Sequence, residues 1–132
     1  MNFARTETGT RMIKDLHHIQ IAIPVGGEDE ARGFYSGILG FAEVEKPVLL
    51  RTRGGLWLET ASVRLHLGVE DPFLPAKKAH PGFSVHNLED VKTTLAQAGI
   101  EFRRDIDLPG MTRIYISDPF GNRIELLETQ PD

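Results

Sequence analysis

The most informative part of the chain for its fold is Asp118-Pro-Phe-Gly-Asn-Arg-Ile-Glu-Leu-Leu-Glu128. Its first half is turn chemistry, because proline presets φ while glycine and asparagine tolerate positive φ. Its second half alternates polar and apolar residues, which is the period of a half-buried strand. The predicted strand therefore turns Ile124 and Leu126 to one face and Glu125 to the other.

A related stretch lies earlier in the chain. Arg123-Ile-Glu-Leu126 aligns with Arg64-Leu-His-Leu67, and further upstream Lys78-Ala-His-Pro81 aligns with Leu16-His-His-Ile19. Each copy has the pattern of one strand, one helix and three further strands, written βαβββ. Because two copies are too few for a solenoid, the duplication predicts a single α+β domain.

The two copies set the expected domain boundaries. Residues 1–13 lack hydrophobic periodicity and are predicted to be a flexible N-terminal tail. The single domain is expected to span residues 14–132, with module one at 14–68 and module two at 79–128. A linker containing two prolines, residues 68–78, joins the modules.

Hydrophobic alternation and helical spacing predict the individual elements. Strands are expected over residues 16–23, 41–44, 56–59, 63–67, 80–85, 101–103 and 113–117, before the closing strand through Glu125. A first helix covers 31–39 and stops at Gly40, and a second runs from the N-cap Asn87 to Gly99.

Composition excludes several classes of protein. The chain of 132 residues has no cysteine, which rules out disulfides, thiolate metal sites and cysteine nucleophiles. Its net charge of −4, without an extended basic cluster, argues against a nucleic-acid partner. No apolar run resembles a signal peptide or a bilayer span, so we expect a cytoplasmic protein with no membrane partner.

Alternation also sorts the ionisable side chains. Four of them fall opposite the apolar faces of their strands: His18, His66, His80 and Glu125. The duplication makes His18 equivalent to His80, and His66 equivalent to Glu125. If the two sheets curl toward each other, all four converge in one cavity. Neutral imidazoles with a carboxylate are typical ligands of a divalent first-row metal, although any single strand histidine is more often an ordinary polar residue.

Other residues are predicted to surround this cavity. Arg113 and Tyr115 are candidates to bind an anionic substrate, with a solvated strand face as the alternative. Phe120 is expected either to line the pocket or to cap the core. Leu56 and Leu58 are predicted to share the cavity face and to make its walls apolar.

Two stretches carry a family resemblance. The sequence Ala31-Arg-Gly-Phe-Tyr-Ser-Gly-Ile-Leu-Gly-Phe41 and the turn-strand segment Asp118-Pro-Phe-Gly-Asn-Arg-Ile-Glu125 resemble the vicinal-oxygen-chelate superfamily, over about residues 15–128. This group includes glyoxalase I, fosfomycin-resistance transferases, extradiol dioxygenases and bleomycin-binding proteins. The resemblance implies two βαβββ modules that form a cupped, mostly antiparallel sheet with helices on its outer face.

The resemblance also implies site residues. The metal positions of the family lie on the first and last strands of each copy, which are His18, His66, His80 and Glu125 here. Glyoxalase I generally has glutamates at both last-strand positions, one of which moves the proton. This chain differs from glyoxalase I because His66 occupies one of those positions.

Two functions of different classes follow from this site. The first is a metal-dependent enzyme that holds Zn, Ni, Mn or Fe and acts on a small molecule chelated through oxygens, with Glu125 as ligand and proton carrier. Whether it is a lyase or isomerase, a transferase or a dioxygenase stays open. The alternative is a metal-free small-molecule binding or antibiotic-resistance protein of the bleomycin-resistance type. We further expect a homodimer, with exchange of modules between chains left open.

Overall fold

The structure is a computed structural model, and it describes residues 11–130. Most of the expected tail, residues 1–10, lies outside the described part. The elements of module one are β1 (Ile19–Ile23), α1 (Glu28–Ala31), the π-helical turn η1 (Arg32–Ser36), β2 (Ala42–Val44), the 3-10 helix η2 (Val48–Arg53), β3 (Leu56–Thr60) and β4 (Val63–Val69). Those of module two are β5 (Gly82–Ser84), α2 (Leu88–Gln97), β6 (Arg103–Arg104), β7 (Met111–Ser117) and β8 (Arg123–Thr129).

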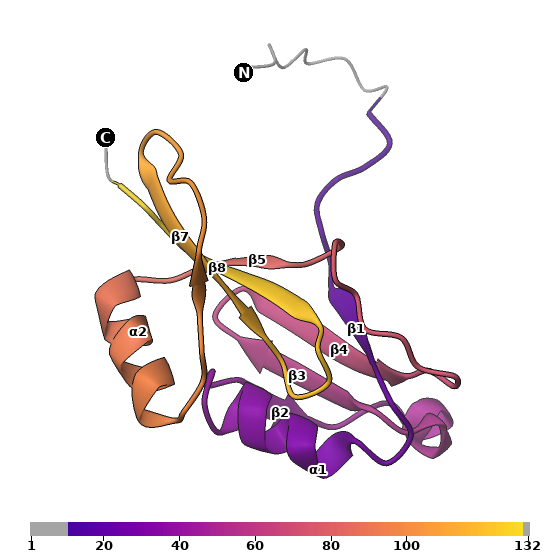
Figure 1. Cartoon of the computed structure of the whole chain (residues 1–132). Helices are drawn as coiled ribbons and strands as arrows, with labels where there is room; N and C mark the ends of the chain where they lie inside the picture. Colours follow the sequence, from indigo (N-terminus) through magenta and orange to yellow (C-terminus); the bar gives the residue numbers. More distant parts are fainter. Residues whose placement is uncertain (1–10, 131–132) are drawn as a thin grey trace.

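Each module forms its own four-stranded sheet, and the two sheets have the same topology. The strand orders are β1-β4-β3-β2 and β5-β8-β7-β6. In both sheets the first strand pairs in parallel with the last, and the remaining pairs are antiparallel. Figure 1 shows α1 and α2 at the lower and left edges of the strands. The predicted α+β fold of two βαβββ modules is confirmed.

The register confirms the equivalence of the site positions. In the first sheet Gln20 pairs with His66, and in the second Gly82 pairs with Glu125. His18 and His80 each precede these partners by two residues, so they hold corresponding places in the two modules.

The two helices follow their sequence signals to different degrees. The side chain of Asn87 caps α2 by accepting a hydrogen bond from the backbone N–H of Asp90 at 3.0 Å. Gly99, with φ of +74°, ends that helix as predicted. The first helix is only one α-helical turn before it widens into η1, where the amide of Gly37 bonds the carbonyl of Arg32 five residues earlier.

One hydrophobic cluster draws side chains from both modules. Module one contributes Tyr35 and Leu58, and module two contributes Ile116 and Ile124; these side chains are fully or almost fully buried. The rings of Phe41 and Phe83 meet edge to face across the modules, with centroids 5.7 Å apart.

The turn before β8 ties the modules together. The amide group of Asn122 donates to the carbonyl of Ala22 at 2.9 Å, and its oxygen accepts from the amide of Ala76 at 2.9 Å. The hydroxyl of Tyr35 donates to the carboxylate of Asp118 at 2.7 Å. This turn therefore joins module one, the linker and module two.

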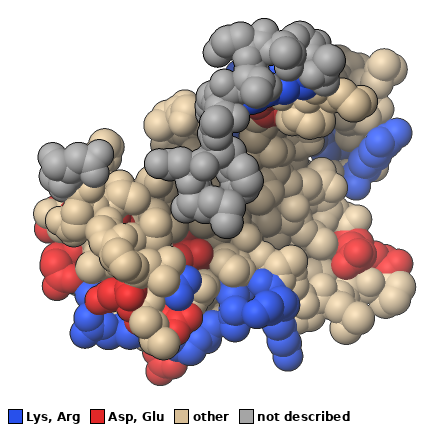
Figure 2. All heavy atoms as spheres, turned by 90° about the horizontal axis from the view of Figure 1, so that it is seen from above, with Lys and Arg blue, Asp and Glu red and all other residues tan. Residues whose placement is uncertain are grey.

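In Figure 2, acidic and basic side chains lie mainly at the lower edge and the sides of the visible face, around a largely uncharged centre. Among residues 11–130, no helix is long and apolar enough to cross a membrane.

Candidate functional site

The candidate ligands of module one belong to a stack of rings across the first sheet. The imidazoles of His18 and His66 lie with centroids 4.3 Å apart and an interplanar angle of 21°. On the opposite side His66 stacks on Trp57, with centroids 4.0 Å apart and an angle of 2°. We call His18, His66 and Trp57 the ring stack. His18 is exposed, whereas His66 is only 8% exposed.

The surroundings of His66 lower its pKa. Burial holds its pKa below the ordinary value, and the neighbouring imidazoles of His18 and His17 act in the same direction. The neutral imidazole, which is the form that binds a metal ion, is therefore favoured at neutral pH.

The pKa of His66 can be followed through Trp57, which is the single tryptophan of the chain. In metal-free protein, lowering the pH from about 8 to about 5 is expected to quench its fluorescence in a step centred below the ordinary histidine value of about 6.5. The quenching arises because protonated His66 is stacked directly on the indole ring of Trp57. The variant His66→Gln should lack the step, and a step at or above the ordinary value would contradict the prediction.

The same shift has a consequence for stability. Because the pKa of His66 is lower in the native chain than in the unfolded chain, the unfolded chain takes up a proton on His66 at a higher pH. His66 therefore contributes stability that is complete above about pH 6.5 and is lost progressively as the pH falls from there through its native pKa. Urea unfolding of the native sequence and of His66→Gln, across the same pH range, measures this difference.

The candidate ligands of module two face each other directly. Nε2 of His80 lies 3.2 Å from Oε1 of Glu125. Nδ1 of His80 lies 2.8 Å from the carbonyl oxygen of Lys78, which can only accept, so Nδ1 carries a hydrogen. In a neutral imidazole, the lone pair of Nε2 then points at the carboxylate. Two such acceptors at this distance need a proton or a cation between them, so the donor set fits a metal ion.

Arg113 and Tyr115 also surround Glu125, but neither is free. Nη1 of Arg113 lies 3.3 Å from Oε2 of Glu125 and donates to the hydroxyl of Tyr115 at 2.9 Å. The same guanidinium bonds Asp105 at 3.3 Å and the carbonyl of Ile106 at 3.2 Å. The groups predicted to bind an anionic substrate are thus engaged within the chain, where they position the carboxylate of Glu125.

The two pairs do not meet within one chain. The structure brings His18 to His66 and His80 to Glu125, but residues 11–130 contain no group of three or more histidine, aspartate or glutamate side chains that could hold a metal ion. Each module therefore carries half of the predicted ligand set. We call these the module-one pair and the module-two pair.

The prediction for Leu56 and Leu58 is wrong. The antiparallel register pairs Trp57 with His66, so Trp57 shares the polar face. Leu56 and Leu58 point to the opposite face, where they are 2% and 0% exposed in the core. The sequence does contain a signal for this arrangement. If Leu56 and Leu58 face the core, alternation along the strand places Trp57 on the same face as His66.

Phe120 takes the second of its two predicted roles. Its ring packs against the core, lies over Gly27 and meets Phe73 edge to face with centroids 6.3 Å apart. A Cβ on Gly27 would lie 2.9 Å from this ring, so a larger residue at position 27 would force the ring of Phe120 to shift. Phe120 therefore caps the junction of the modules.

A pocket beside the ring stack contains residues that the sequence did not single out. It has a volume of about 460 Å³ and is bounded by β1, β3, β4 and η2. We call it the module-one pocket. Its lining includes Trp57, Lys46, Leu50 and Arg53 in addition to the predicted histidines.

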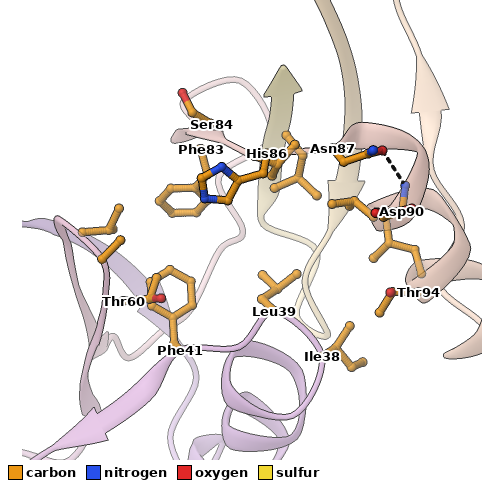
Figure 3. A pocket seen from close by; sticks show the side chains of 16 residues that line it. Ile38, Leu39, Phe41, Thr60, Phe83, Ser84, His86, Asn87, Asp90 and Thr94 are labelled. Carbon is orange, nitrogen blue, oxygen red and sulfur yellow. Dashed lines mark hydrogen bonds between the residues drawn. The ribbon is translucent and has the colours of Figure 1, made fainter. Parts of the chain in front are cut away.

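A second cavity, of about 470 Å³, lies between the modules on the helix side (Figure 3). Its wall is largely apolar and includes Leu39, Phe41 and Phe83, with Asp90 and His86 among its polar groups. None of the predicted site residues lines it, so the candidate ligands and this groove are separate features.

The family follows from comparison with known proteins. A sequence profile of the Glyoxalase/Bleomycin resistance protein/Dioxygenase superfamily matches residues 15–126. The chain belongs to this superfamily, which is the one that its two resembling stretches predict.

Individual relatives agree with this assignment. A crystal structure of a glyoxalase family protein from Bacillus anthracis is 45% identical, covers 91% of this chain and 98% of its own, and has a TM-score of 0.88. Glyoxylase I 4 of Arabidopsis thaliana is 27% identical over 86% of this chain and 70% of its own length. The fosfomycin resistance protein FosX of Listeria monocytogenes is 16% identical with a TM-score of 0.73 over 90% of this chain and 96% of its own, which shows a shared fold.

Proposed function

We propose that this chain is a metal-dependent enzyme of the glyoxalase/dioxygenase type that acts on a small molecule chelated through oxygens. A divalent ion, Zn, Ni, Mn or Fe, is held by His18, His66, His80 and Glu125. The observation that carries the proposal is the contact between His80 and Glu125 at 3.2 Å, with the other imidazole nitrogen fixed by a backbone carbonyl. Superfamily membership supports it.

The residues of the chain would divide the chemistry as follows. When bound, the ion supplies Lewis-acid stabilisation of negative charge on the substrate oxygens. Glu125 moves a proton through its carboxylate, which is buried and therefore shielded from bulk water. Arg113 orients Oε2 of that carboxylate, and the carbonyl of Lys78 fixes the tautomer and orientation of His80.

We also propose that the active form is a homodimer in which the module-one pair of one chain meets the module-two pair of its partner. Separation of the two pairs within a chain supports this arrangement. β1 and β5 are edge strands of their sheets, so each leaves a row of backbone groups for pairing. Three apolar side chains just before β1 are 80% or more exposed: Met12, Ile13 and Leu16.

A second candidate is a metal-free binding or antibiotic-resistance protein. The module-one pocket favours it, because the ring stack and the cations beside it form a ligand-sized concavity without any metal. Elemental analysis of protein purified without a histidine tag separates the two functions. Stoichiometric metal supports the enzyme, and none after supplementation supports the binding protein.

Ligand variants test the enzyme proposal directly. His18→Ala and Glu125→Gln are each expected to weaken metal binding by more than about 100-fold, because loss of an outer-shell partner alone costs 10 to 100-fold. Isothermal titration with Zn measures this, and far-UV circular dichroism should stay unchanged. The matched control is His86→Ala, since His86 is exposed and lines the separate groove between the modules, whereas His17 contacts His18 at 3.0 Å. Full affinity in Glu125→Gln would remove that residue from the ligand set.

A further inference from the structure

The module-one pocket is positively charged on one wall. Lys46 and Arg53 line it together with the imidazoles of His17, His18 and His66. No aspartate or glutamate is among its lining residues. The charge of this concavity is therefore complementary to an anion.

Arg53 differs from its neighbour Arg51 in what it contacts. Both lie on η2, but Arg51 bonds the carboxylate of Glu45 at 3.5 Å and the carbonyl of Lys46 at 3.3 Å. Arg53 has no hydrogen-bonding or ion-pair partner within residues 11–130, and it lines the pocket. A guanidinium without a partner, beside a pocket that no carboxylate lines, has its donors available for a ligand.

The wall that carries Arg53 is fixed in place. The ammonium group of Lys46 donates to the carbonyl of Gly54, and the amide of Gly55 donates to the carboxylate of Glu28 at 2.9 Å. A Cβ on Gly55 would lie 2.0 Å from the carbonyl oxygen of Leu67, so this close approach to β4 requires glycine. The backbone of this wall is therefore anchored next to Arg53, so a ligand has to order the side chain of Arg53 but little of the backbone.

Apart from Gln20, the remaining side chains that line the pocket are apolar or aromatic. Trp57, Leu50 and Val69 line it beside the cations. We propose that this pocket binds the oxyanion group of a small molecule with a short apolar body, and that Arg53 determines this specificity. The inference rests on the proposed function in one respect: it assigns the substrate of that site to small molecules with a carboxylate, phosphonate or similar oxyanion.

Trp57 provides the readout, because the single tryptophan lies in the pocket. The probes are butylphosphonate and butyrate, with butyramide as the neutral isostere of butyrate. Titrated at about pH 8 with a chelator present, the two anions are expected to change the fluorescence of Trp57 saturably, and butyramide is not. This pH lies well above the reference value of about 6.5 for an imidazole group, so the selectivity reports cations other than imidazolium.

The variants assign the effect to Arg53. Arg53→Ala is expected to weaken binding of butylphosphonate about tenfold, which corresponds to the loss of a charge-assisted hydrogen bond of about 1.4 kcal/mol. Arg53→Lys should restore part of the affinity, and Arg51→Ala should change it less than about twofold, because Arg51 is engaged by Glu45 outside the pocket.

Three results would overturn the inference: equal losses in Arg53→Ala and Arg51→Ala, equal binding of butyramide and butyrate, or no saturable change with either anion. None of these three results depends on whether the protein binds a metal ion. Failure of the metal-dependent function appears separately, as unchanged Zn affinity in the ligand variants. The two proposals can therefore fail independently.

Discussion

Replacing Asn122 with alanine is expected to lower the free energy of unfolding by about 4 kcal/mol. The side chain is 1% exposed, and it bonds the carbonyl of Ala22, the amide of Ala76 and the carboxylate of Asp118, each at 2.9 Å. Truncation removes all three bonds, and a bond between neutral groups contributes about 1 kcal/mol while a bond to a carboxylate contributes about 2 kcal/mol. Because the bonds reach module one, the linker and the preceding turn, urea denaturation should show the whole domain destabilised.

The control for this variant is Asn87→Ala. Asn87 is exposed and makes one capping bond to the amide of Asp90, so its loss is expected to cost about 1 kcal/mol. Both variants remove the same side chain. If the two lost the same stability, the junction role of Asn122 would be refuted, and the side chain would matter only as a local turn residue.

The second large effect is complementation between inactive chains. His18→Ala and Glu125→Ala chains are each expected to lose tight metal binding, and mixing them in equal amounts after unfolding is expected to restore about a quarter of the sites. Half of the randomly paired dimers are mixed. In each of these, one site receives the intact module-one pair from one chain and the intact module-two pair from the other. Metal analysis after dialysis measures the recovery.

Two controls make the complementation specific. Mixing His18→Ala with His66→Ala chains should restore nothing, because both changes damage the module-one pair. Light scattering of the native protein should give twice the chain mass of 14.7 kDa. A monomer would contradict the dimer, and a dimer without recovery would contradict a metal site shared between two chains.

The strands of the two modules, the second helix and the duplication could all be predicted from the sequence alone. The alternation in β8 predicts that Ile124 and Leu126 are buried, and both lie in the core. Asn87 and Gly99 predict the limits of α2, which the structure confirms. These features were predictable because they depend on local chemistry: side chains alternate with a period of two in a strand, and caps satisfy the backbone groups at helix ends.

The sequence also placed the candidate ligands on corresponding strands. His18 and His80 precede equivalent register positions, and His66 and Glu125 occupy equivalent strands beside them. This could be predicted because a repeated sequence folds into a repeated module, so each residue inherits the position of its counterpart.

How the modules use these residues depends on tertiary contacts that the sequence pattern does not contain. It turned Leu56 and Leu58 into the core, set Trp57 against His66, and engaged Arg113 with Glu125 and other partners. It also separated the two ligand pairs within the chain. The physical reason is that a periodic pattern describes the two faces of one strand, whereas cross-strand register and the packing of one sheet against another depend on contacts between residues far apart in sequence.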